Sequence, residues 1–210
     1  GDVLMKGLCS TDKFLRAILN KETGLLPPKA LLSHVGIIES PNYHKLLFLT
    51  DMAVVPLPDL KQKMTLANYV VKIARSFGIA KPKVAFIAAS EQVLASMPAC
   101  LEAAALAKMA DRGQIKGCIA DGPLALDVAI DNESVEIKKL TSPVAGDADC
   151  LVFPNIESAN VFWKTNSKLS TGVRQAGMLV GTTAPCILAS RADSVDTKLN
   201  SIAEAVMSVK

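Results

Sequence analysis

Residues 60–89 read LKQKMTLANYVVKIARSFGIAKPKVAFIAA, and this stretch predicts the fold class of the chain. Apolar side chains recur at helical spacing over residues 60–77, and Gly78 ends the pattern. The short apolar run at 84–89 that follows is typical of a buried parallel strand. A helix that leads directly into a buried strand is the repeating unit of an α/β fold.

The same alternation continues on both sides of this stretch. Other helices are predicted at 98–110, 156–168 and 194–209. A further helix contains the apolar positions among residues 14–19, and a short one follows residue 123 and ends at 130. Strands are expected at 35–38, 46–50, 117–120, 149–153, 178–180 and 187–189. The sequence therefore predicts an α/β protein with largely parallel sheets and flanking helices.

Composition excludes several classes of protein. Among 210 residues, 50% are apolar and 20% charged, which is enough apolar side chain for a sizeable core. A net charge of +3 and an aromatic content of 4% disfavour nucleic acid as a partner. The sequence contains no apolar run long enough to span a bilayer, so no membrane partner is expected.

The cysteines and histidines give no sign of a disulfide or metal framework. Five cysteines at wide spacing without a C-x-x-C pair argue against disulfides and a zinc site, so we expect cytoplasmic localisation. His34 and His44 lack other ligand residues nearby and are interpreted as strand or loop residues, and Trp163 is interpreted as a core residue. Neither a G-x-G-x-x-G motif, a phosphate loop nor a G-x-S-x-G elbow is present.

Polar sequence follows four of the predicted strands, at 88–91, 121–123, 153–158 and 189–194. Ligands of open α/β sheets bind at such strand-to-helix junctions, although helix capping explains any single one equally well. The last junction is more specific, because Ser190, Arg191 and Asp193 lie beside a helix N-terminus that favours an anion. The positive charge of an arginine in the first turn is repelled by the positive end of the helix dipole, and an anionic ligand between the guanidinium and the helix N-terminus removes this repulsion.

Several strings together resemble one family. They are DGPLALD at 121–127, PNIESAN at 154–160, SRADS at 190–194 and the opening LMKG at 4–7, which Ser10-Thr11-Asp12 and Leu15-Arg16 follow. The chain resembles the phosphate acetyl/butyryltransferase family, and its phosphate butyryltransferase branch most. The resemblance implies a two-domain α/β fold shared with isocitrate and isopropylmalate dehydrogenases, and a homodimer or larger assembly. It also implies transfer of a short acyl group, of the butyryl type, between coenzyme A and inorganic phosphate to give an acyl phosphate.

Members of that family are longer, and the comparison places the start of this chain late in their first domain. Residues 1–28 then form the tail of domain one, 29–172 an inserted second domain that dimerises, and 173–210 the return to domain one. The first domain is expected to be incomplete, with its N-terminal part lacking. An alternative is therefore a non-catalytic remnant that binds coenzyme A or acyl phosphate. An NAD-linked dehydrogenase on the same fold is disfavoured, because the sequence shows no acidic cluster to hold its metal.

The resemblance also assigns roles to residues. Ser190 and Arg191 match the catalytic Ser-Arg pair, and Arg16 matches a substrate-binding arginine. The family's acetyl branch has an aspartate base where this chain has Thr197, so Asp196 or Asp193 is expected to serve as the base. The other residues predicted to contact substrate are Asp193, Ser194, Asn155 and Glu157. Coenzyme A is expected as a substrate, with no tightly bound cofactor and no metal.

Overall fold

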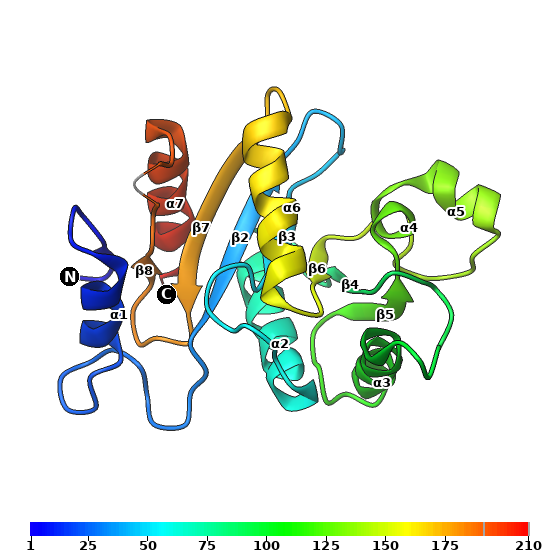
Figure 1. Ribbon diagram of the computed structural model, residues 1–210, viewed down its shortest axis with the longest axis horizontal. Coiled ribbons are helices and arrows are strands. Elements are labelled where there is room, and N and C mark those ends of the chain that lie inside the picture. The colour runs from blue at the N-terminus through cyan, green and yellow to red at the C-terminus, as the bar shows by residue number, and fades with distance from the viewer. Residues whose placement is uncertain (191, 210) are drawn as a thin grey trace.

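The computed structural model describes residues 1–190 and 192–209, and Figure 1 shows an α/β molecule with helices on both faces of one sheet. Over those residues the sheet has eight strands: β1 (Leu4–Met5), β2 (Ser33–Glu39), β3 (Leu47–Thr50), β4 (Lys83–Ile87), β5 (Ile119–Leu124), β6 (Cys150–Val152), β7 (Arg174–Val180) and β8 (Cys186–Ile187). The helices are α1 (Thr11–Ile18), α2 (Leu60–Ser76), α3 (Pro98–Asp111), α4 (Leu126–Ile130), α5 (Asn132–Lys138), α6 (Ile156–Leu169) and α7 (Val195–Ser208). The predicted α/β class is confirmed.

The strands follow the order β1-β8-β7-β2-β3-β6-β4-β5 across the sheet. In the described part of the chain, four of the seven pairings are parallel: β1 with β8, β3 with β6, and β4 with both β5 and β6. The pairings of β2 with β3, β2 with β7, and β7 with β8 are antiparallel. The sheet is thus mixed, and it joins the first and last parts of the chain where β1 pairs with β8. The division into domains at 28 and 172 stays a prediction.

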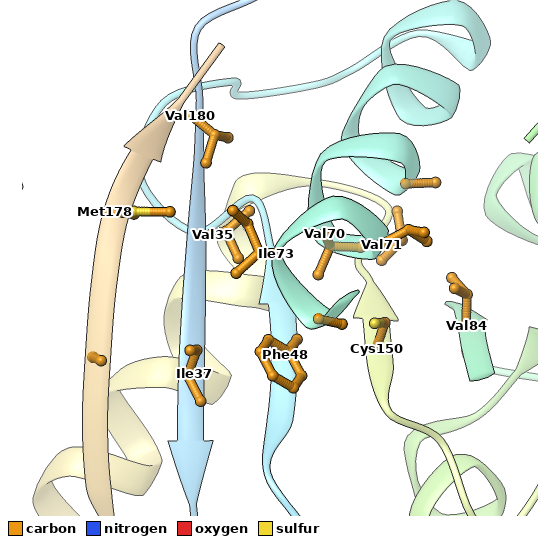
Figure 2. Packing of buried hydrophobic residues seen from close by; sticks show 14 of the residues in the cluster. Val35, Ile37, Phe48, Val70, Val71, Ile73, Val84, Cys150, Met178 and Val180 are labelled. Carbon is orange, nitrogen blue, oxygen red and sulfur yellow. The ribbon is translucent and has the colours of Figure 1, made fainter. Parts of the chain in front are cut away.

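Helix α2 packs on the sheet through a long apolar face. Asp59 and Gln62 form a capping box at its start, in which each side chain accepts a hydrogen bond from the other's backbone N–H. Figure 2 shows Val70 and Ile73 of this helix facing the sheet near Phe48, all of them buried. Burial of each such side chain stabilises the fold by about 1.5–3 kcal/mol. This face of the sheet also carries α3 and α7.

Helices α4 and α6 cover the opposite face. A Cβ atom added to Gly36 in β2 would lie 2.7 Å from Cζ3 of Trp163, so the missing side chain makes room for the indole on the sheet. Trp163 therefore packs against the core, as the sequence predicts, and it also borders a cleft between α6 and α7.

Element boundaries differ from the predictions in places that have a physical explanation. The strand expected at 117–120 is β5, which begins at Ile119 and extends to Leu124. The polar run 121–123 is therefore part of a strand, and its prediction as a strand-to-helix junction is wrong. Pairing with β4 continues through this run, and just beyond β4 the backbone N–H of Ala88 donates to the carbonyl of Leu124. Two short elements, β1 and α5, lack a pattern long enough to be recognised. Within the described residues no helix is both long and apolar enough to cross a membrane.

Candidate active site

A cleft of about 650 Å³ opens where strands β7 and β8 separate. The two strands pair only through Leu179 and Cys186 and then diverge. Side chains and backbone from the ends of β1 and β8, from β2 and β7, and from α6 and the start of α7 line the opening. Because the carboxyl ends of β1 and β8 meet here, the cleft has the position in which α/β proteins bind ligands.

The turn from Ser190 to Asp193 forms one wall of the cleft. The backbone N–H of Ser190 donates to Oδ2 of Asp193 at 2.6 Å, and the N–H of Asp193 donates to the Ser190 carbonyl at 3.2 Å. The hydroxyl of Ser190 accepts the N–H of Ala192 at 3.3 Å and is exposed. Arg191, predicted as catalytic, lies outside the described residues. Ser190 and Asp193 are thus brought to the cleft together, and the Asp193 carboxylate fixes the shape of the turn.

Helix α7 begins directly after this turn. Ser194 is its N-cap and accepts the backbone N–H of Thr197 at 3.0 Å. Thr197 lines the cleft, whereas Ser194 and the exposed Asp196 do not. The first-turn N–H groups of a helix carry partial positive charge, so this end of the cleft favours an anion.

The other predicted substrate-binding residues lie outside this lining. Arg16 is 80% exposed and pairs with Asp12 on α1, with Nε 3.0 Å from a carboxylate oxygen. Asn155 caps α6 by accepting the N–H of Ser158 at 2.9 Å, and Glu157 is exposed in the first turn of that helix. The structure therefore gives Asn155 a capping contact and leaves any substrate contact of these residues a prediction.

Lys6 is a cleft residue that sequence reasoning did not single out. Its side chain is buried, and Nζ donates to the carbonyls of Gly7 at 3.4 Å and Cys9 at 3.3 Å. No acidic group among the described residues pairs with it. A buried ammonium at the edge of a cleft is stabilised by an anionic ligand. The signal that could have found it is its place in the LMKG string.

His34 is the second such residue, and it lies at the floor of the cleft in β2. Its Nδ1 lies 2.6 Å from Sδ of Met52. A Cβ atom at Gly177 would lie 2.6 Å from Cε1 of His34, so the glycine in the neighbouring strand leaves space for the ring. Burial lowers the pKa of His34, and the negative charges of Asp51 and Asp193 oppose that shift only in part. The imidazole is therefore neutral at neutral pH.

Asp51 anchors the loop that carries Met52. Its buried carboxylate accepts backbone N–H groups from Ala53 at 2.8 Å, Val54 at 2.9 Å and Val55 at 3.1 Å. It also accepts the Ser33 hydroxyl at 2.9 Å and the N–H of His34 at 3.3 Å. With five donors around it, this carboxylate has a structural role and holds the loop against β2.

The cleft combines hydrogen-bond donors and cations with the carboxylate of Asp193 and the neutral imidazole of His34. The part of the chain that the structure describes holds no group of three His, Cys, Asp or Glu side chains that could bind a metal ion. The described residues of the cleft can bind an anion through Lys6 and the α7 N-terminus, and can donate a hydrogen bond from Ser190. An ionisable side chain of the cleft, such as His34 or Asp193, can transfer a proton. These features define an α/β protein with a cleft suited to a small anionic ligand.

Comparisons with known proteins identify the family. A model of the family described as "Phosphate acetyl/butaryl transferase" matches residues 1–206. The phosphate butyryltransferase of Clostridium acetobutylicum is 51% identical over 206 residues, which cover 98% of this chain and 68% of that protein. The phosphate acetyltransferase of Rhizobium meliloti is 42% identical over 207 residues, or 99% of this chain and 65% of that protein. The chain belongs to the phosphate acetyl/butyryltransferase family, as the sequence resemblance predicted.

Solved structures agree with this assignment. The branched-chain phosphotransacylase from Enterococcus faecalis V583 superposes with a TM-score of 0.91 at 32% identity. The match covers 99% of this chain and 74% of that one. The α/β architecture of the described residues is therefore that of a phosphotransacylase.

Proposed function

We propose that this protein transfers a short acyl group between coenzyme A and inorganic phosphate, giving an acyl phosphate. Membership of a family of phosphate acyltransferases supports the reaction class. The observation that carries the proposal is the cleft itself. In it, the hydroxyl of Ser190, the α7 N-terminus and the buried cation Lys6 meet at the ends of two parallel strands.

In the proposed reaction a phosphate oxygen attacks the thioester carbonyl, and negative charge develops on the carbonyl oxygen as the carbon–sulfur bond breaks. Lys6 and the guanidinium of Arg191 are suited to hold phosphate, because both present charged N–H donors. The Ser190 hydroxyl and the N–H groups of the first turn of α7 are suited to stabilise the oxyanion. Holding both reactants in one cleft supplies a further part of the rate acceleration.

The remaining predicted roles belong to the same proposal. Arg16, Asn155, Glu157 and Ser194 lie outside the cleft lining, so contacts from them would be made to parts of a long substrate that extend beyond it. Asp196 is exposed at the start of α7, where its charge also stabilises the helix N-terminus, and its role as the base stays a prediction. Assembly as a homodimer or larger oligomer is part of this proposal, and sedimentation velocity tests it.

We propose a preference for butyryl over acetyl groups, and the higher identity to the butyryltransferase than to the acetyltransferase supports it. Comparing kcat/KM for butyryl-CoA and acetyl-CoA at the same phosphate concentration tests this preference. A ratio near or below one would assign the acetyl substrate instead.

Replacing Ser190 tests the proposed acyl transfer. Ser190→Ala is expected to lower kcat by about 10²–10³, the range for loss of one oxyanion donor. The assay is thiol release from butyryl-CoA with and without phosphate, and the exposed Ser170→Ala, beyond the end of α6, is the matched control. Binding can be followed separately through the fluorescence of Trp163, the lone tryptophan, which borders the cleft.

Two results would contradict the proposal. Thiol release that does not depend on phosphate would identify a thioesterase. Coenzyme A binding, seen as a change in Trp163 fluorescence without any phosphate-dependent release, would identify the non-catalytic remnant.

A further inference from the structure

The imidazole of His34 lies in β2 with Nδ1 facing the sulfur of Met52. The residue is 5% exposed, and its Nδ1 lies 2.6 Å from the Met52 sulfur. A thioether sulfur has no proton to donate, so a polar contact with it favours the neutral tautomer that carries its proton on Nδ1. Nε2 is then the nitrogen with the free lone pair. Among the described residues nothing forms a hydrogen bond with Nε2, and the ring lines the cleft.

The other ionisable groups that face this cleft are less suited to move a proton. Lys6 and Lys164 line it as cations and have no lone pair to accept a proton. Asp51, packed against His34 from the β3 side, has both carboxylate oxygens occupied by backbone and hydroxyl donors. Asp193 uses Oδ2 to accept the Ser190 N–H at 2.6 Å and close the turn before α7, and its Oδ1, without a hydrogen bond among the described residues, is the competing acceptor. His34 is left as the neutral base at the floor of the cleft.

The backbone around His34 is arranged to accommodate the ring. Gly177 in β7 pairs with Gly36, and a Cβ atom at Gly177 would lie 2.6 Å from Cε1 and 3.1 Å from Nε2 of His34. The Gly177 N–H is bonded to Ser201 of α7 at 3.0 Å, so the strand cannot shift easily to admit a larger residue. The ring is thus fixed between Met52 on one side and Gly177 on the other.

We propose that His34 is the proton-transfer residue of this cleft, carrying a proton between inorganic phosphate and the sulfur of the acyl thioester. This inference rests on the proposed acyl transfer. Hydrogen phosphate gives its proton to Nε2 as its oxygen forms the bond to the acyl carbon. The carbon–sulfur bond breaks, its electron pair leaves with sulfur, and Nε2–H returns the proton to that sulfur. The products are acyl phosphate and a free thiol, and the ring ends neutral as it began.

Kinetics of a histidine variant test the proposal. His34→Asn keeps a donor near the Met52 sulfur but removes Nε2, so kcat is expected to fall by about 10²–10⁴. KM for phosphate should stay within about threefold, because the neutral ring contributes no charge to phosphate binding. The matched control is His44→Asn, since His44 is exposed and pairs with Asp147 away from the cleft.

The pH profile gives a readout that a purely structural role would not change. In the wild-type protein, kcat/KM should fall at acid pH as Nε2 becomes protonated, and the low pKa of His34 places this fall below the ordinary histidine range. Cys9, Lys6, Lys164 and Asp193 also line the cleft, and all four are unchanged in both variants. The acid limb should disappear in His34→Asn and persist in His44→Asn.

A spectroscopic measurement does not depend on activity or on the folding of a variant. In the long-range ¹H–¹⁵N spectrum of the wild-type protein, one of the two histidines should appear at neutral pH as the Nδ1–H tautomer. His44→Asn assigns the signals. A charged ring or an Nε2–H tautomer at His34 overturns the inference, and so does a His34→Asn enzyme with wild-type kcat. A wild-type protein without phosphate-dependent thiol release overturns the proposed function itself, and this inference with it.

Discussion

Replacing Glu204 with leucine should stabilise the protein, and increasingly so as the pH rises. Glu204 lies on α7 and is 1% exposed, and neither carboxyl oxygen has a hydrogen-bond partner among the described residues. The side chain borders an open groove of about 200 Å³, whose lining is the apolar Ile37, Leu46, Phe77, Ala176, Ala203 and Met207 together with the polar Glu39, Arg174, Gln175 and Asn200. Burial in these surroundings raises the pKa of Glu204 well above its ordinary value of 4.5.

The magnitude follows from proton linkage. Between the ordinary pKa and the raised one, the unfolded chain has lost the Glu204 proton while the folded chain keeps it. The free energy of unfolding therefore falls by about 1.4 kcal/mol for each pH unit across that window. Below the window, Glu204→Leu still removes an unsatisfied polar group, which is worth about 1–3 kcal/mol. The gain of the variant should thus be about 1–3 kcal/mol at acid pH and grow with pH above it.

Urea unfolding followed by the fluorescence of Trp163 measures this difference. Wild type and Glu204→Leu are compared at several pH values from about 5 to 8, so that the contributions of other titrating groups cancel in the difference. Glu204→Gln is the control, because it removes the pH dependence while keeping a buried polar group. Parallel stability curves for wild type and Glu204→Leu would refute the assignment of a protonated, unpartnered carboxyl.

Unlike Glu204, the carboxylates of Asp51 and Asp147 should stabilise the protein, so removing either charge should lower the free energy of unfolding. Asp51→Asn should lower the free energy of unfolding by about 3 kcal/mol or more, because the amide loses at least two charge-assisted hydrogen bonds. Urea unfolding measures this loss, and the exposed cap variant Asp59→Asn, for which a smaller loss is expected, is the comparison. Partial burial raises the pKa of Asp147, but hydrogen bonds from Lys45, Lys83 and a histidine outweigh this and hold it well below its ordinary range. The stabilisation by Asp147 is therefore present at neutral pH and lost as the pH falls below about 4. The urea midpoint of the wild-type protein should drop over this acid range, and that of Asp147→Asn should not. An equal drop in both proteins would contradict the ion-pair network.

The parts of the fold that were predicted from sequence are those with long, regular patterns. Helix α2 has seventeen residues of helical periodicity with a capping box before them, so its position follows from local signals. Strand β5 is different, because its residues Asp121 to Pro123 are polar or turn-forming and its register comes from pairing with β4. Tertiary pairing thus overrides the local preference for a turn, and no single-sequence pattern reports it.

The candidate site divides in the same way. The Ser190 turn was predicted because its hydroxyl, its carboxylate and the following helix cap are neighbours in sequence. Lys6 and His34 reach the same cleft only because β1 pairs with β8 and β2 pairs with β7. Neither pairing can be read from local composition, and an isolated histidine in an apolar strand has the pattern of an ordinary core residue.

The separation of β7 from β8 explains why these remote residues form a site at all. Had the two strands continued to pair beyond Leu179 and Cys186, backbone hydrogen bonds would fill the space that the cleft now occupies. The N–H of Gly177 instead bonds to Ser201 of α7, so the open edge of β7 is satisfied by the helix that the Ser190 turn introduces. The same turn therefore supplies the hydroxyl, aims the helix N-terminus and leads into the helix that satisfies the exposed strand edge.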